Sequence, residues 1–159
     1  MENYSDFVVH KSERAVHTDS IVLTVNDLND KLYDFQKDIV RWALAKGRAA
    51  IFADCGLGKP AMQLEWAHRV CEHTGGNALI VAPLTVSPQT VGEGLKFGVP
   101  VTLCETADDI KPGVNITNYE KLDKFTGAHF SAVVLDESSI LKSFTGKVRN
   151  QIIDFFSDT

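Results

Sequence analysis

The segment ADCGLGKP, residues 53–60, carries residue types that bind phosphate. Gly56 and Gly58 allow a tight turn whose backbone N–H groups converge on phosphate oxygens, and a helix that follows such a turn adds the positive end of its dipole. The ammonium group of Lys59 would reach the β- and γ-phosphates of a nucleotide. The segment therefore predicts a phosphate-binding loop, and an ordinary tight turn is the alternative.

A pair of acidic residues, Asp136 and Glu137, closes the apolar run AVVL. A hydrophobic strand that ends in Asp-Glu would place Asp136 near a magnesium ion, usually through water, and Glu137 would orient and activate an attacking water. The alternative is an exposed strand end with two solvated acids. The presence of the Gly loop in the same chain favours the chemical interpretation.

These two segments need a scaffold, and the hydrophobic pattern predicts alternating strands and helices. Strands are predicted in RAAIFAD, NALIVAP, VPVTLCE, VNITN and FSAVVLDE, and helices in YDFQKDIVRWALAKG, AMQLEWAHRVCEH, near SPQTVGEGLKF and over residues 145–156. This alternation indicates an α/β fold with a parallel sheet wrapped by helices. The chemistry of such sheets lies at the carboxyl ends of strands, where both ADCGLGK and LDE fall.

Two regions are expected along the chain. Residues 1–31 are polar and mixed, and form an N-terminal arm with a short strand at 20–25; residues 32–159 form the α/β lobe. In the first helix of the lobe, Phe35, Ile39, Trp42 and Ala43 are spaced to share one apolar face, and Gly47 is a C-terminal cap. Trp42 and Trp66 are both expected in the core.

Composition excludes several classes of protein. The 159 residues are 44% hydrophobic and carry a net charge of −5. The chain therefore lacks the overall positive charge that is typical of nucleic-acid-binding proteins, and contact with nucleic acid would need a local basic patch. The three cysteines are far apart and without CxxC spacing, which argues against a zinc site or a disulfide framework. No apolar run approaches membrane-spanning length. We expect a cytoplasmic protein with no membrane partner.

The chain resembles the first RecA-like lobe of superfamily 2 helicases, particularly the Swi/Snf-type DNA translocases and their phage relatives. The match runs over most of residues 32–156 in the order of the family's motifs. Its parts are Gln36 in LYDFQ for the adenine-reading glutamine, CGLGK for motif I, VAPLTV for motif Ia, ITNYE for motif Ib and LDES for the DEAD/DEAH-type motif II.

The resemblance implies a RecA-like three-layer fold and roles for particular residues. Glu137 and Lys59 would be catalytic, and Asp136 would hold Mg²⁺ through water. The nucleotide-binding set would be Gln36, Gly56, Leu57, Gly58, Lys59 and Pro60. Motifs Ia and Ib touch the nucleic-acid backbone in that family, which implicates Pro83, Thr85, Thr117 and Asn118. The alternatives are a polar residue on a solvent-facing helix surface for Gln36 and ordinary strand-end loops for motifs Ia and Ib.

Pro60 departs from the family pattern. Ser or Thr at this position supplies a hydroxyl to magnesium and a backbone N–H to phosphate, and proline has neither group. Proline is well tolerated in the first turn of a helix, so the fold should persist. We therefore expect weakened binding of ATP and Mg²⁺ and impaired hydrolysis.

The second departure is that the 159 residues contain neither the motif III strand nor the second lobe with its arginine finger. In the family that strand lies between the loop strand and the motif II strand, so the sheet would be incomplete. Three alternatives follow for the chain. It would close the sheet in a different way, borrow a strand from another copy or from a partner, or be only part of a longer gene product.

These departures favour a truncated helicase-like ATPase lobe that does not hydrolyse ATP alone. It would act by binding a protein partner through exposed sheet edges, as a decoy, inhibitor or regulatory subunit in nucleic-acid processing, suited to a phage. The alternative is the nucleotide- and DNA-binding half of an active ATP-dependent helicase or translocase that another chain completes. DNA and a second copy of the chain are further candidate partners.

Overall fold

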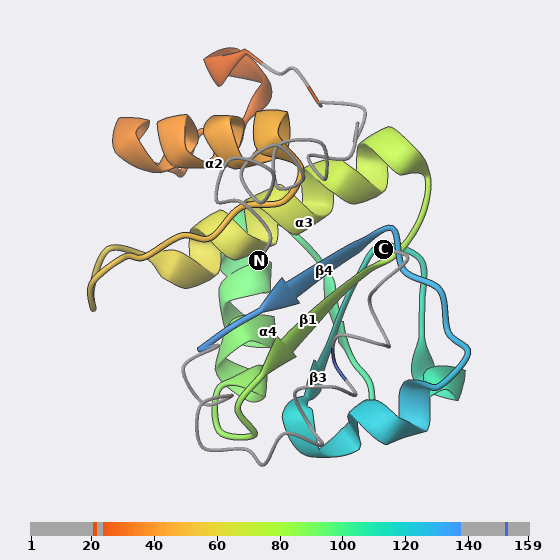
Figure 1. The fold of residues 1–159 in the computed structure, drawn as a ribbon. Coiled ribbons are helices and arrows are strands. Elements are labelled where there is room, and N and C mark those ends of the chain that lie inside the picture. Colours follow the sequence, from red (N-terminus) through yellow and green to blue (C-terminus); the bar gives the residue numbers. More distant parts are fainter. Residues whose placement is uncertain (1–20, 22–23, 138–151, 153–159) are drawn as a thin grey trace, which may run out of the picture.

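The computed structural model describes residues 21, 24–137 and 152. Its centre is a four-stranded sheet in the order β2-β3-β1-β4 (Figure 1). The strands are β1 (Ala78–Ala82), β2 (Val101–Leu103), β3 (Val114–Asn118) and β4 (Ala132–Leu135). Every pairing is parallel. The predicted α/β fold with a parallel sheet is confirmed.

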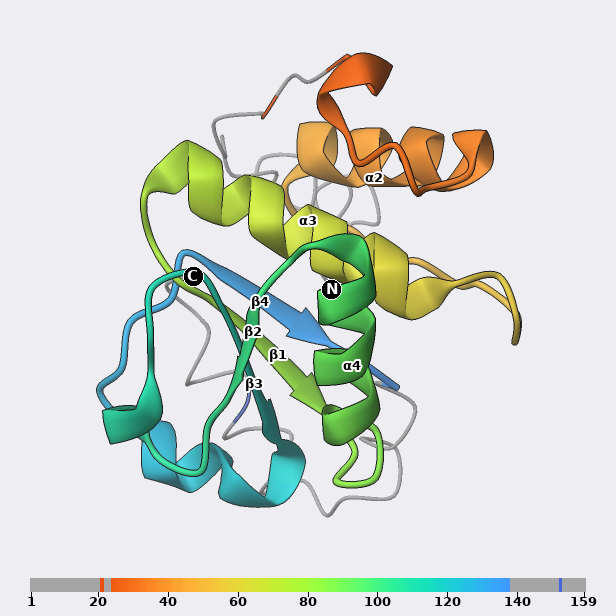
Figure 2. The same ribbon diagram turned by 180° about the vertical axis from the view of Figure 1, so that it is seen from behind.

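Helices cover one face of this sheet in two tiers. Helices α3 (Lys59–Thr74) and α4 (Ser87–Phe97) pack on the strands, and α2 (Asp34–Lys46) lies on the outer side of α3 (Figures 1 and 2). Three short 3₁₀-helices complete the described elements: η1 (Val25–Asp27), η2 (Ala107–Asp109) and η3 (Tyr119–Phe125).

The strands alternate their side chains between two apolar clusters, as strand geometry requires. Ile80 of β1 faces the cluster built with α2, α3 and α4. Leu79 and Val81 face a second cluster that includes Phe125 of η3 and the buried Ile152. Because both faces are covered, β1 and β3 are buried along their whole length, which is typical of central strands in parallel sheets.

The strand predicted in RAAIFAD is wrong. Residues 49–53 have no strand pairing, and the side chain of Phe52 is 96% exposed. The segment runs from the end of α2 toward the protruding Gly loop (Figure 1). A strand needs a hydrogen-bonded neighbour, and in the described part of the chain the sheet ends at β4, leaving this segment without one.

The apolar face predicted for α2 is right in part: Ala43 is buried and Ile39 packs against the core, but the fully buried stripe is shifted by one residue. The buried residues are Gln36, Val40, Ala43 and Leu44, which keep the expected helical spacing. Trp42 is 47% exposed, so its expected place in the core is wrong. Since one residue turns a helix by about 100°, the contact with α3 selects a neighbouring stripe. Gly47 does cap the helix, through its N–H to the carbonyl oxygens of Ala43 and Leu44.

The chain ends lie largely outside the described residues. Of the strand expected at 20–25, residues 20, 22 and 23 are not described, and Val25 begins η1 instead. The helix expected at 145–156 is described at Ile152 alone, which is helical and buried. The boundary between an arm at 1–31 and a lobe at 32–159 stays a prediction.

Candidate functional site

The Gly loop leads directly into α3, as the sequence predicts. Gly56 (φ 84°) and Gly58 (φ 73°) both have left-handed backbone conformations, which glycine adopts without steric cost. Gly58 is the N-cap of α3, and its carbonyl oxygen accepts the N–H groups of Ala61 and Met62. Lys59 is the first helical residue, so its side chain projects from the positive end of the helix dipole.

Gln36 holds this loop against α2. Its Nε2 donates to the Leu57 carbonyl oxygen at 3.0 Å, and its Oε1 accepts the Tyr33 N–H at 3.0 Å. The side chain is buried, so the solvent-facing alternative for Gln36 is wrong. Both polar atoms of the side-chain amide are hydrogen-bonded within the protein, so Gln36 connects the start of α2 to the Gly loop.

The acidic pair follows β4 at its carboxyl end. The Asp136 N–H donates to the Val81 carbonyl oxygen at 2.8 Å, which extends the β1–β4 ladder by one residue. Asp136 Oδ1 accepts from Gln63 Nε2 at 2.8 Å and from the Glu137 N–H at 3.0 Å. Glu137 has a positive φ of 51°, uncommon outside glycine, so the chain turns sharply here.

Tyr119, the first residue of η3, contacts the backbone of the turn at Asp136 and Glu137. Its Oη donates to the Asp136 carbonyl oxygen at 2.7 Å. Burial raises the pKa of the Tyr119 phenol, and the charges of Asp136 and Glu137 raise it further. The phenol therefore stays protonated and keeps its donor role over the physiological pH range.

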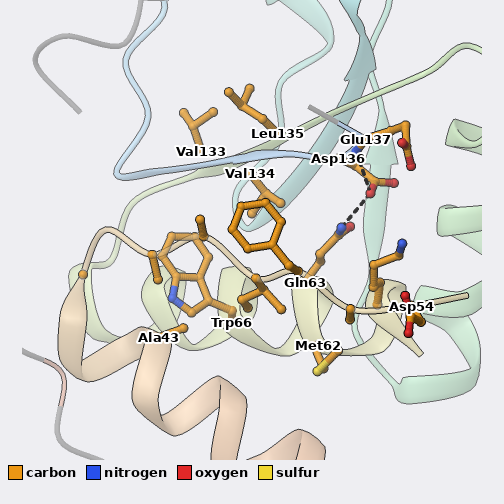
Figure 3. Close-up of a pocket in the computed structure, with 17 residues that line it drawn as sticks. Ala43, Asp54, Met62, Gln63, Trp66, Val133, Val134, Leu135, Asp136 and Glu137 are labelled. Atoms are coloured by element: carbon orange, nitrogen blue, oxygen red, sulfur yellow. Dashed lines mark hydrogen bonds between the residues drawn. The ribbon is translucent and has the colours of Figure 1, made fainter. Parts of the chain in front are cut away.

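One cleft of about 740 Å³ brings the loop lysine and the acidic pair together (Figure 3). Residues 49–54 line one side and β4 residues the other, with α3 side chains between them. Lys59, Asp136 and Glu137 all line this cleft. The other predicted nucleotide-binding residues are not among the lining residues: Gln36, Gly56, Leu57, Gly58 and Pro60.

Sequence reasoning missed Asp54 and Gln63, which also line the cleft. Gln63 follows Lys59 by four residues on α3, so both side chains lie on one helix face. That spacing was the available signal. The Gln63 amide donates to Asp136, as Figure 3 shows, while its Oε1 is buried without a hydrogen-bond partner among the described residues.

The acidic side chains near the Gly loop are few and one of their oxygens is already hydrogen-bonded. The described residues contain no cluster of three His, Cys, Asp or Glu side chains able to hold a metal ion. Asp136 Oδ1 is already occupied by two N–H donors, which leaves Oδ2 as its open acceptor. Lys59 and the start of α3 bring positive charge to the cleft, whereas Asp54, Asp136 and Glu137 bring negative charge to it.

The residues predicted to touch nucleic acid lie at the ends of two adjacent strands. Val81 and Ala82 of β1 pair with Thr117 and Asn118 of β3. Thr85 is exposed in the turn after β1 and Pro83 is half-buried. The Thr117 hydroxyl is buried and donates to the Cys104 carbonyl oxygen, and the Asn118 side chain caps η3 by accepting the Glu120 N–H. Direct nucleic-acid contact by these four residues stays a prediction.

Comparison with protein-family models and with curated protein sequences gave no match. Among solved structures, the chain is similar to a Sulfolobus solfataricus SWI2/SNF2 ATPase core in complex with dsDNA, with a TM-score of 0.66 and 20% sequence identity. The likeness covers 82% of this chain and 31% of the other, so the chain spans about a third of the length of that neighbour.

The fold is therefore that of a RecA-like α/β lobe, as in the ATPase core to which it is similar. At this level of identity the likeness is one of fold. Among the described helices, none has the length and apolar character needed to cross a membrane.

Proposed function

We propose that this chain is a helicase-like nucleotide-binding lobe that binds the phosphates of ATP at its Gly loop, does not hydrolyse ATP alone and acts by binding a partner in nucleic-acid processing. The observation that carries the proposal is that Lys59, Asp136 and Glu137 line the same cleft. The Gly loop beside it has the left-handed glycines that a phosphate-binding turn needs.

Each residue would have a defined part. The Lys59 ammonium and the free N–H groups around Gly58 would bind phosphate oxygens. Asp136 Oδ2 would face a hydrated Mg²⁺, whose chemistry is to neutralise charge that develops on the phosphates. Glu137 would orient water. Gln63 would keep Asp136 in place through its amide hydrogen bond.

Pro60 is the reason to expect weak binding and no turnover. It occupies the first turn of α3 and offers neither an N–H to phosphate nor a hydroxyl to magnesium. Loss of one charge-assisted hydrogen bond costs about 1.5–3 kcal/mol. That energy corresponds to about 10- to 150-fold in affinity. Catalysis depends on a correctly placed metal and should suffer more than binding.

Calorimetric titration with ATP and Mg²⁺ tests the proposal. The wild type should bind weakly, Lys59→Ala should abolish binding, and Pro60→Thr should bind about 10- to 150-fold more tightly because it restores the donor. Lys111→Ala is the matched control, since Lys111 is exposed on a loop far along the chain and outside the cleft. Equal, tight binding by the wild type and Pro60→Thr would show that the proline has little effect.

A second candidate is the nucleotide- and DNA-binding half of an active translocase that another chain completes. It is favoured by the convergence of Lys59, Asp136 and Glu137, and by the fold neighbour, which is a complex with dsDNA. ATP hydrolysis should be assayed with and without DNA at high protein concentration. Turnover that disappears in Lys59→Ala would favour this candidate over the non-catalytic one.

DNA contact can be tested at the exposed Thr85. Binding of labelled single- and double-stranded DNA should be followed over a salt series, because phosphate-driven binding weakens as salt increases. Thr85→Glu should weaken such binding, and Thr126→Glu, an exposed position after η3, is the control. Binding without salt dependence would not be driven by backbone phosphates.

A further inference from the structure

The side-chain amide of Gln36 is hydrogen-bonded at both of its polar atoms. Oε1 accepts the Tyr33 N–H at 3.0 Å, and Nε2 donates to the Leu57 carbonyl oxygen at 3.0 Å. A primary amide can form further hydrogen bonds, but this residue is only 4% exposed. The Nε2 atom also lies against the Gly loop, since a Cβ atom on Gly58 would be 2.3 Å from it. A bound base would therefore meet no open donor or acceptor on Gln36.

The place of Gln36 in α2 accounts for a glutamine without any nucleotide base. Tyr33 is the N-cap of α2, and Gln36 is the third helical residue. A glutamine at this third position commonly accepts the N–H of the N-cap residue and so stabilises the start of the helix. The same side chain then holds Leu57 of the Gly loop through Nε2. Gln36 therefore caps α2 and positions the Gly loop.

Rotation of the Gln36 amide toward adenine would add little affinity. The amide would form two hydrogen bonds with the base and break two, which would leave the Tyr33 N–H and the Leu57 carbonyl oxygen without this partner. A ligand favours a rearranged state only by the difference between its interactions in the two states. A base that leaves Gln36 in place should therefore bind as well as adenine.

The groups that remain open at the Gly loop suit phosphate. The backbone N–H groups of Gly58 and Lys59 have no hydrogen-bond acceptor among the described residues. The Lys59 side chain lines the cleft, whereas Gln36 is not among the residues that line it. Backbone donors at a helix start bind phosphate oxygens, which all nucleoside triphosphates share.

We propose that the site recognises the triphosphate group and not adenine, with Gln36 as a positioning residue that holds the Gly loop. ATP and GTP are then equivalent ligands, and inorganic tripolyphosphate carries the group that is recognised. This differs from the adenine-reading role that the resemblance implies for Gln36. The inference rests on the function proposed above, because it specifies the ligand of the same site.

Calorimetric titration compares the Mg²⁺ complexes of ATP, GTP and tripolyphosphate, with adenosine as the control that has no phosphate. A glutamine amide that reads adenine would favour ATP over GTP by about 5- to 150-fold. We expect instead that the dissociation constants of ATP and GTP agree within about 3-fold. Tripolyphosphate should compete with ATP, and adenosine should not bind. A larger preference for either nucleotide, or failure of tripolyphosphate to compete, would overturn the inference.

The same titrations on Pro60→Thr separate this inference from the proposed function, because tighter binding is expected there. Absence of binding by every phosphate ligand to both proteins would contradict the proposed function and this inference with it. Binding of ATP without binding of GTP would leave the proposed function standing and overturn this inference alone.

The matched variants are Gln36→Ala and Gln89→Ala. Gln36→Ala should weaken ATP and GTP by the same factor, about 2- to 10-fold, because it releases the loop that both ligands use. If the amide read adenine, ATP alone would be weakened. Gln89 is exposed on α4 and outside the cleft, so Gln89→Ala should leave both affinities unchanged. Circular dichroism verifies folding, and the wild-type comparison of ATP with GTP decides the question should Gln36→Ala not fold.

The Gln36 side-chain amide also gives a positional readout by NMR. Its signals are the pair that Gln36→Ala removes from the spectrum of the protein. Saturation with ATP, GTP or tripolyphosphate should leave this pair at the same position in all three complexes, because the base does not touch the amide. A shift that only ATP causes would show contact with adenine and would overturn the inference.

Discussion

At the scale of single residues, Gly58 is the position where the Gly loop leaves no room for a side chain. A Cβ atom there would lie 2.3 Å from Gln36 Nε2, and the φ of 73° is unfavourable for any L side chain. Gly56 has a similar φ of 84°, yet a Cβ there would meet nothing within 4 Å. Substitution of Gly56 therefore adds backbone strain alone, whereas substitution of Gly58 adds the same strain and also displaces the Gln36 side chain.

We predict that Gly58→Ala destabilises the protein more than Gly56→Ala. Each change places alanine in a left-handed conformation, which costs about 1–2 kcal/mol. Gly58→Ala also breaks the hydrogen bonds of the buried Gln36 amide, each worth about 0.5–1.5 kcal/mol. Urea unfolding measures both.

The control is the same glycine pair in a Gln36→Ala background. There the two glycine substitutions should cost nearly the same, because the side chain that Gly58→Ala displaces is gone. If the difference persisted without the glutamine, the contact between α2 and the Gly loop would not be its cause.

Cys104 predicts how stability changes in alkaline solution. Burial raises the pKa of its thiol from 9.0 to about 11. The neutral thiol is thus favoured in the folded state, and this contribution to stability is fully present below pH 9. It is lost as pH rises toward 11, because the unfolded chain releases the proton first.

Urea midpoints between pH 8 and pH 11 should therefore fall more steeply for the wild type than for Cys104→Ala. The exposed Cys55 gives the matched variant, Cys55→Ala, which should keep the wild-type slope. Equal slopes for the wild type and Cys104→Ala would show that the buried thiol does not contribute to the loss of stability.

At the scale of elements, the sequence predicts β1, β3 and α4 well because each is bounded by local signals. Gly75 and Gly98 end α3 and α4 with left-handed caps, and the apolar runs between such turns have strand length. The stripe that α2 buries was missed by one residue, since only its contact with α3 decides which of two adjacent stripes turns inward.

The segment 49–53 was missed for a different reason. Its composition is that of a buried strand, but pairing is not a local property, and the described chain has no neighbour for it. At the site, Lys59 and the acidic pair were predictable from motif types, and their meeting in one cleft is consistent with that prediction. The spacing of Gln63 from Lys59 could have placed it on the same face of α3, but its hydrogen bond to Asp136 could not be predicted, because the two residues lie 73 positions apart in sequence.

The Gly loop contains a cysteine whose reactivity can report nucleotide binding. Cys55 is exposed within the loop, whereas Cys71 and Cys104 are buried. A thiol reagent should therefore modify one cysteine quickly and two slowly. If ATP and Mg²⁺ bind at the loop, saturating nucleotide should slow the fast modification at least 10-fold.

Mass spectrometry of alkylated peptides assigns the modified cysteine. Lys59→Ala should remove the protection, and adenosine, which has no phosphates, should give none. Should calorimetry detect ATP while Cys55 reacts at an unchanged rate, the nucleotide would bind away from the Gly loop and the proposed site would be wrong.

At the scale of the whole molecule, the sheet is strongly asymmetric. Its interior strands β1 and β3 are buried throughout and paired on both sides. On one flank lie β4 and then the cleft, beyond which residues 49–53 carry the exposed Phe52. The carboxyl ends of β3, β1 and β4 lie in a row, so this flank adjoins the candidate site.

This asymmetry predicts a gradient of amide hydrogen exchange across the free protein. Amides of β1 and β3 should exchange only through global unfolding, because opening them breaks pairs on two sides and uncovers both apolar clusters. Amides of β4 should exchange faster through local opening, and those of residues 49–53 at nearly the rate of an unstructured peptide. Mass-spectrometric exchange on the free chain measures all three. Protection of residues 49–53 equal to that of β1 would mean that the segment is a paired strand in solution. Rapid exchange there, together with slow exchange in β1, would instead locate the incomplete side of the sheet at the cleft that holds Lys59 and Asp136.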